Sequence, residues 1–173
     1  KAVWATYDTN LDEWTKAYLG QKPKDADALN KNLFYSKYNS RFTFMGDAPA
    51  KVLAKPTVEF LLDTLIGTQR QFVIRITPNR KVNRYDIFAN EKMVFYNFKA
   101  NGAGALGQKD SKFPRRGKKI ISYYVVDNEP LELEFSLPEK TVFDMDLMES
   151  SFDLMTQNDF GITIRKPLML TKP

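Results

Sequence analysis

The sequence predicts a mainly β protein: an antiparallel, jelly-roll-like β-sandwich with one or two short helices. From about residue 41 onward, apolar side chains alternate with polar ones, which is the period of strands that bury one face. Proline falls mainly between these alternating runs, where it interrupts no ladder of hydrogen bonds. Two packed sheets are the natural way to bury so many apolar faces, so we expect about eight to ten strands in two layers.

Two of these runs show the alternation most clearly, and their apolar members are expected to be buried. They are Phe72, Ile74, Ile76, Leu131, Leu133 and Phe135. Similar alternation predicts further strands at 58–62, 85–88, 94–99, 142–147 and 161–165. In the run 94–99 it assigns Val94, Tyr96 and Phe98 to one face. Residues 89–92 are expected to form a hairpin turn.

The first twenty residues predict a short strand followed by one short amphipathic helix. Leu11, Trp14 and Tyr18 lie near the spacing of a helical stripe, and Gly20 is a suitable stop. Residues 21–32 are polar and are expected to form a loop. A second, flexible loop is predicted at 101–107, where the spacing of the glycines matches neither a dinucleotide-binding fingerprint nor a phosphate-binding loop.

Composition limits the chemistry that this chain can perform. Its 173 residues are 43% hydrophobic, so we expect a folded, single β-rich domain over residues 1–173. Histidine and cysteine are both absent, which excludes His–Cys zinc sites, Ser–His–Asp triads and Cys–His dyads. We therefore expect no enzyme activity, metal or cofactor in this chain. Because the sequence begins inside a predicted strand without an initiator Met, we also expect it to be a fragment of a longer membrane protein.

A basic loop follows the glycine-rich segment. Its members are Lys109, Lys112, Arg115, Arg116, Lys118 and Lys119, with only Asp110 as an acid. Such a loop can contact anionic lipid headgroups, and the other interpretation is a solvated loop without a ligand. The loop lacks the stacking aromatics of a single-strand nucleic-acid binder, so no nucleic-acid partner is expected.

Four aromatic residues near the N-terminus form a second candidate site. Trp4, Tyr7, Trp14 and Tyr18 could provide a platform for a sugar or another ligand. The interpretation that we favour is internal packing, since Trp and Tyr usually serve burial.

Four carboxylates near the C-terminus form the third candidate. They are Asp144, Asp146, Glu149 and Asp153. Strand alternation places Asp144 and Asp146 on one face, but two Asp residues separated by one position make no calcium loop without its Gly and distal Glu. A solvated acidic face is the interpretation that we favour, ahead of a calcium site or an acid–base pair.

Both ends of the chain carry sequence patterns that are similar to those of a known family. The segment AVWATYD (2–8), with LDEWT (11–15) and YLG (18–20), resembles the stretch after the last membrane helices of large, multi-spanning zinc aminopeptidases (metallopeptidase family twenty-eight, which includes vacuolar membrane protease-like proteins). The tail NDFGITIRKPL (158–168) is similar to the end of those proteins, and residues 70–77 with 85–92 resemble their β-rich central stretch.

The resemblance implies a C-terminal, extracytoplasmic domain on the periplasmic or lumenal side, tethered to the membrane in the full-length protein. Its partners would be the peptidase and membrane domains of the same polypeptide. The zinc ligands of that family include histidines, so no catalytic residue can be carried over, and zinc is expected only in the missing catalytic domain.

We therefore expect a non-catalytic accessory domain that shields or positions substrate for a membrane-bound zinc aminopeptidase. The alternative is a carbohydrate- or ligand-binding β-sandwich module that uses the aromatic cluster. A third hypothesis is a hydrolase that works through Asp144 and Asp146.

Overall fold

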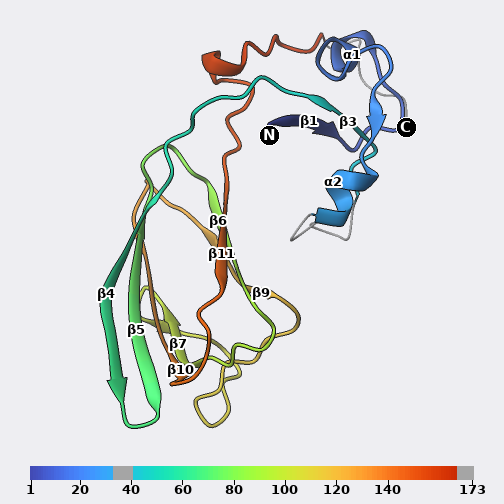
Figure 1. Cartoon of the computed structure of the whole chain (residues 1–173). Coiled ribbons are helices and arrows are strands. Elements are labelled where there is room, and N and C mark those ends of the chain that lie inside the picture. The colour runs from blue at the N-terminus through green and yellow to red at the C-terminus, as the bar shows by residue number, and fades with distance from the viewer. Residues whose placement is uncertain (33–40, 167–173) are drawn as a thin grey trace. The chain divides into compact units, whose positions relative to one another are not determined.

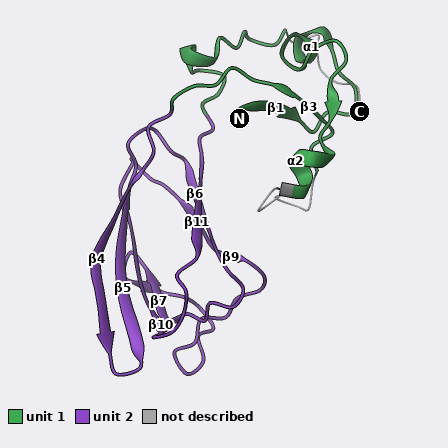
Figure 2. Ribbon diagram, in the orientation of Figure 1, with its two compact units in different colours: residues 1–52, 153–173 green, residues 53–152 purple. Residues whose placement is uncertain are grey.

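The computed structural model describes residues 1–32 and 41–166, and the chain divides into two compact units (Figures 1 and 2). Unit 1 combines Lys1–Val52 with Asp153–Pro173, and unit 2 is Leu53–Phe152. Unit 2 is thus continuous in sequence, whereas unit 1 is built from both ends of the chain. The single domain expected for residues 1–173 remains a prediction. Among the described residues, no helix is both long and apolar enough to span a membrane.

Unit 2 is an antiparallel structure of two sheets (Figure 1). The five-stranded sheet has the order β4 (Thr57–Ile66), β5 (Gln69–Thr77), β10 (Leu131–Pro138), β7 (Tyr96–Ala100) and β8 (Ala103–Gly104). The three-stranded sheet has the order β11 (Met145–Ser150), β6 (Arg84–Ala89) and β9 (Lys119–Tyr124). The prediction of a mainly β, antiparallel fold with short helices is confirmed.

The core of unit 2 lies between these two sheets. All six residues that the alternation assigned to the core are buried: Phe72, Ile74, Ile76, Leu131, Leu133 and Phe135. They form one cluster with Tyr85 and Ile87 of β6 and Ile120 of β9. The sandwich is therefore held by apolar side chains from both layers, as its period-two sequence requires.

The predicted facing of residues 94–99 is wrong. Phe95 and Phe98 are both buried, at 1% and 2% exposure, although they were assigned to opposite faces. Asn97 has a positive φ of 52°, and the pairing of β7 with β10 shifts register there. An extra residue in one strand reverses the alternation beyond it, so Phe98 points to the same side as Phe95.

The glycine-rich segment is more ordered than the sequence analysis predicted. Strand β8 pairs with β7 through a two-residue turn, Asn101–Gly102, in which both residues have positive φ. Type I′ hairpin turns require this geometry, and Asn–Gly is their strongest sequence signal. The Asn–Gly pair is visible in the sequence, but the other glycines of residues 101–107 led to the prediction of a flexible loop.

Unit 1 contains a small sheet and two short helices. Its strands have the order β1 (Val3–Thr6), β3 (Phe44–Asp47) and β2 (Lys24–Asp25), and its helices are α1 (Glu13–Leu19) and α2 (Asp27–Asn32). Helix α1 begins after Asp12, whose carboxylate accepts a hydrogen bond from the Thr15 amide, and ends at Gly20 with φ 88°. A Cβ at Gly46 of β3 would lie 2.8 Å from the Leu19 carbonyl oxygen, so only glycine allows this close approach.

Two further sequence predictions are corrected in unit 1. Residues 21–32 were expected to be a loop but contain β2 and α2. Residues 161–165 were expected to be a strand but form none, and they pair with no strand among the described residues; they follow the short helix η2 (Asn158–Phe160). The alternation did not predict a buried face here, since Ile164 is 87% exposed. Thr163 instead bonds to Trp14 and Tyr18 of α1. Pro167 and Leu168, which belong to the resemblance at the C-terminus, lie outside the described residues.

Candidate functional site

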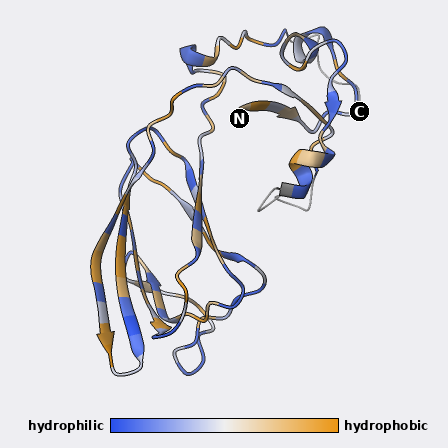
Figure 3. Cartoon of the chain, viewed as in Figure 1, coloured by the Kyte–Doolittle hydropathy of each residue, from blue (hydrophilic) through white to orange (hydrophobic). Residues whose placement is uncertain are grey.

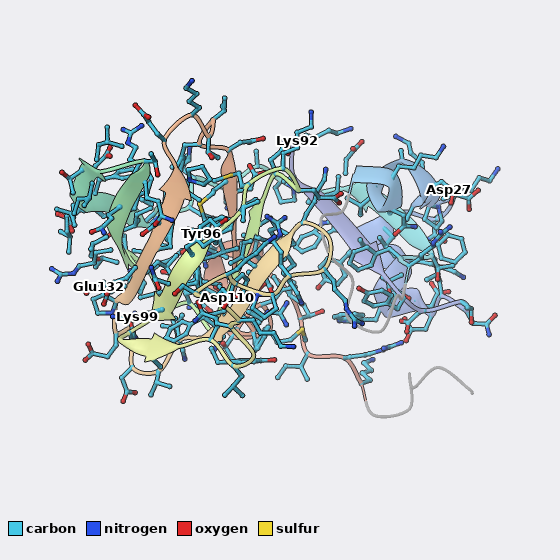
Figure 4. All side chains as sticks on the ribbon, turned by 90° about the horizontal axis from the view of Figure 1, so that it is seen from below. Asp27, Lys92, Tyr96, Lys99, Asp110 and Glu132 are labelled. Atoms are coloured by element: carbon cyan, nitrogen blue, oxygen red, sulfur yellow. The ribbon has the colours of Figure 1, made fainter. Side chains whose placement is uncertain are left out.

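The basic loop, residues 109–119, is tied to β7 by its backbone. Lys109 and Lys112 flank a tight turn in which Asp110 and Ser111 have positive φ, and the Lys112 amide donates to the Lys109 carbonyl at 2.8 Å. Lys112 also forms a β-bridge with Tyr96 of β7; Tyr96 and Asp110 are labelled in Figure 4. The two lysines therefore lie at the ends of a defined turn.

Phe113 anchors the next part of the basic loop to the core. Its amide donates to the Phe95 carbonyl at 2.8 Å. Its ring lies 4.6 Å from the ring of Phe98, measured between centroids. The aromatic residue within the basic run therefore packs inward, and it holds the neighbouring charges at a fixed place on the surface.

Arg115 points inward and joins two turns. Its guanidinium donates to the carbonyl oxygens of Ala89 at 2.8 Å, Asn90 at 3.0 Å and Gly117 at 2.7 Å. Burial lowers the pKa of this guanidinium, and the Glu91 charge opposes that effect. Because its donors are used by backbone oxygens, Arg115 stabilises the loop and is not available to a ligand in this conformation.

The other predicted contact residues also differ in exposure. Lys119 belongs to β9, is half-buried and donates to the Ser122 hydroxyl at 3.3 Å. The remaining four residues are exposed, and none has an ion pair within the described part of the chain. We call them the basic patch: Lys109, Lys112, Arg116 and Lys118.

A pocket of about 420 Å³ lies beside the basic loop. Its lining includes the apolar side chains of Met93, Phe95 and Phe113, and its cations Lys109, Lys112 and Arg115 outnumber its one acid, Glu91. This volume is in the range of small-molecule sites, and the combination suits an anionic group attached to an apolar body. Residues 91–95 could not be predicted to line this pocket, since only the fold brings them to the loop.

The aromatic cluster of the N-terminus packs against the C-terminal segment. The ring of Tyr18 lies 5.8 Å from that of Trp4 and 5.1 Å from that of Trp14. The indole of Trp14 donates to the Thr163 carbonyl, and the Tyr18 hydroxyl accepts from the Thr163 amide, each at 2.8 Å. Tyr7 lies apart and stacks on Phe42 at 4.3 Å. These contacts favour internal packing over a ligand platform.

An ion pair completes this contact between the two ends of the chain. Arg165 donates to the Asp12 carboxylate at 2.6 Å, and its guanidinium lies 5.4 Å from the Trp14 ring centroid. Burial alone would raise the pKa of Asp12, but hydrogen bonds from Thr15 and Arg165 outweigh it and lower the pKa to about 2. Residues 12–18 and 163–165, from opposite ends of the chain, thus contact each other in unit 1.

The four predicted carboxylates do not gather into one site. Asp144 accepts from the Asn90 amide at 3.0 Å, and Asp146 is exposed. Glu149 pairs with Arg80 at 3.4 Å and is mostly buried, while Asp153 accepts from Gln157. Within residues 1–32 and 41–166, no group of three or more metal-ligating side chains is placed to hold an ion. The expectation of no metal and no cofactor remains a prediction.

One buried charge was missed by the sequence analysis. Asp86 lies in the middle of β6 and is completely buried, although it alternates with the buried Tyr85 and Ile87. It accepts hydrogen bonds from Arg84, at 2.8 Å, and from the Ser122 hydroxyl of β9. These partners neutralise and solvate the carboxylate, which suits a structural role. The sequence contains one indication of this buried carboxylate: Arg84, two residues earlier, can supply its ion-pair partner.

Comparison with known proteins adds no further constraint: no family model, curated protein or solved structure matches this chain.

Proposed function

We propose that this chain is a non-catalytic accessory module that contacts anionic membrane surfaces through its basic patch. The observation that carries the proposal is that four exposed cations without ion-pair partners in the described structure lie on a loop fixed by Phe113 and Arg115. A fixed loop loses little conformational entropy when it binds, so the charges are available at low cost.

The strength of this contact is expected to be low. Each basic residue near an anionic membrane contributes about 1 kcal/mol, so the four together contribute on the order of 4 kcal/mol. That free energy corresponds to a dissociation constant of about 1 mM. The contact therefore becomes useful when another part of the protein already holds the module near the membrane.

The resemblance of residues 2–8 and 158–168 supports a wider proposal about the parent protein. In it, the module belongs to a membrane-bound zinc aminopeptidase, lies outside the cytoplasm, and shields or positions substrate for a catalytic domain of the same polypeptide. Zinc would be held by that catalytic domain, because this chain contains no histidine or cysteine.

The pocket beside the basic loop supports a second candidate function. A ligand-binding module would use this pocket, with Lys109 and Lys112 near an anionic group and Phe95 and Phe113 beneath an apolar one. In this alternative the ligand site is in unit 2, and the aromatic cluster of unit 1 retains its packing role.

Vesicle sedimentation tests the membrane proposal. We expect the chain to sediment weakly with phosphatidylglycerol vesicles at low salt and to be released as salt rises, because salt screens exposed charges. Replacing Lys109, Lys112, Arg116 and Lys118 with Ser should abolish sedimentation. Arg115 is left intact because it bonds the loop together.

A matched variant controls for net charge. Replacing the exposed lysines Lys22, Lys51, Lys55 and Lys81 with Ser removes the same charge elsewhere and should retain most of the sedimentation. Equal sedimentation of the wild type and the basic-patch variant would contradict the proposal. Equal loss in both variants would show that net charge, and not the patch, is responsible.

A further inference from the structure

Strand β4 leaves an apolar edge uncovered in the five-stranded sheet. It is the end strand, pairs only with β5 among the described strands, and exposes nine of its ten residues. Six large apolar side chains along it are 40–57% exposed: Val58, Phe60, Leu61, Leu62, Leu65 and Ile66. Figure 3 shows the apolar character of this strand. An exposed edge of this kind is a template for pairing with another chain.

An apolar groove lies beside this edge, between the two sheets. It has a volume of about 130 Å³ and is lined by Val58 and Phe60 of β4 and by Phe143, Met145 and Leu147 in and before β11. Strand β11 is the end strand of the three-stranded sheet, so the end strands of both sheets border the groove. A strand added next to β4 would direct alternate side chains toward it.

Two carboxylates border the groove and the β4 edge. Asp146 lines the groove, and Glu59 lies between Val58 and Phe60, so it points to the opposite face of β4, beside the position of an added strand. Neither carboxylate has an ion pair within residues 1–32 and 41–166. The basic residue opposite Glu59, Arg75, bonds to Glu132 instead. The two carboxylates therefore complement a cationic partner.

We infer that the β4 edge binds an extended, cationic peptide by strand addition. Backbone hydrogen bonds to β4 would supply the pairing, apolar side chains at alternate positions would enter the groove, and Lys or Arg residues at the other positions would meet Glu59 and Asp146. A second copy of this chain fits less well, since β4 carries no basic residue that could meet Glu59, and its other acid, Asp63, already pairs with Arg70.

A register shift between Phe60 and Leu62 limits where the peptide pairs. The extra residue, Leu61, forms a bulge that separates residues 57–60 from residues 62–66. The groove is lined by Val58 and Phe60 of the first segment, so the apolar side chain of the peptide is expected opposite that segment.

Binding of a labelled synthetic peptide to the whole chain tests this inference by fluorescence anisotropy. The probe is a peptide of about nine residues in which valine alternates with lysine, a length that spans the edge. We expect saturable binding, with affinity lowered at least about tenfold when backbone amides of the peptide are N-methylated, because methylation removes the donors. Replacing the lysines of the probe with glutamate should abolish binding.

Protein variants separate this surface from the basic patch. The double variant Glu59→Lys and Asp146→Lys alters two side chains without ion pairs in the described structure and should weaken binding at least about tenfold. The variant lacking the basic patch should bind the peptide like the wild type, which keeps this inference independent of the membrane proposal. No peptide binding, or equal binding of the N-methylated probe, would overturn it. Self-association abolished by Phe60→Lys would assign the edge to a second copy instead.

Discussion

The buried hydroxyl of Tyr85 is the most unusual polar group of the sandwich core. It has no hydrogen-bond partner within the described residues, and neither do the nearby Arg80 Nε and Glu149 Oε1. Glu149 lies directly opposite Tyr85 in the pairing of β6 with β11. Burial and the Glu149 charge raise the pKa of Tyr85 to about 12. The side chain therefore stays neutral in the folded protein where it would ionise in the unfolded chain.

We expect Tyr85→Phe to leave the free energy of unfolding at neutral pH within about 1 kcal/mol of the wild type, because the lost hydroxyl makes no bond. The free energies of unfolding of the wild type and of Tyr85→Phe should differ at alkaline pH. The wild type loses stability as pH rises from 10 toward about 12, since only the unfolded Tyr85 releases its proton there. Urea unfolding followed by circular dichroism at several pH values measures the difference. A loss above about 2 kcal/mol at neutral pH would show that the hydroxyl is bonded.

Individual residues of the basic loop show what the sequence could predict. Its positive charge is explicit in the sequence, and four of its six cations are exposed. The inward turn of Arg115 could not be predicted, because three of its carbonyl partners, Ala89, Asn90 and Met93, are distant in sequence. Whether a cation of the loop stabilises the fold or faces solvent depends on contacts between distant segments, and composition does not predict these contacts.

At the scale of elements, helix α1 is held in place by the C-terminal segment. Asp12 caps the helix through Thr15 and also pairs with Arg165. A carboxyl whose pKa is lowered on folding stabilises the protein above its unfolded pKa of 3.8, and that contribution is lost as pH falls toward about 2. The contact between the two ends of the chain should therefore weaken in acid.

Asp12→Asn tests this contact. Asparagine can still cap the helix, so the variant mainly loses the charge-assisted bond to Arg165, and we expect unit 1 to lose about 1–2 kcal/mol at neutral pH. The difference from the wild type should vanish as pH falls below about 4 toward 2. Both tryptophans of the chain, Trp4 and Trp14, lie in unit 1, so tryptophan fluorescence reports its unfolding.

Asp25→Asn is the matched control for that experiment. Asp25 is an exposed acid of unit 1 without an ion pair in the described structure, so its replacement should have little effect at any pH. A difference between Asp12→Asn and the wild type that persists at pH values below 2 would contradict the assignment to ionised Asp12.

The strands were predicted best where period-two alternation is uninterrupted. β5 and β10 lie where Phe72–Ile76 and Leu131–Phe135 alternate, and their apolar faces are buried as expected. The prediction failed at β7, where Asn97 inserts an extra residue, and at 161–165, which pair with no strand in the described part of the chain. Alternation reports burial of one face; it does not report a bulge or the presence of a partner strand.

At the scale of the whole molecule, both proposed contact surfaces belong to unit 2. The basic patch lies between β8 and β9, and the peptide-binding edge is β4 at the end of the five-stranded sheet. The aromatic cluster belongs to unit 1, where it packs on the chain's own C-terminal segment. The sequence alone could not show that the aromatic cluster serves packing and not ligand binding, because its contact with the C-terminal segment forms only in the folded chain.

The central claim is that the basic patch contacts anionic lipid, and an NMR titration tests it most directly. Short-chain phosphatidylglycerol is added to the isotope-labelled chain while backbone amide shifts are followed. We predict that the largest changes occur at 109–119 and in the adjoining pocket residues 91–95, and that they disappear when Lys109, Lys112, Arg116 and Lys118 are replaced with Ser. Changes centred on α1, or identical changes in that variant, would contradict the claim.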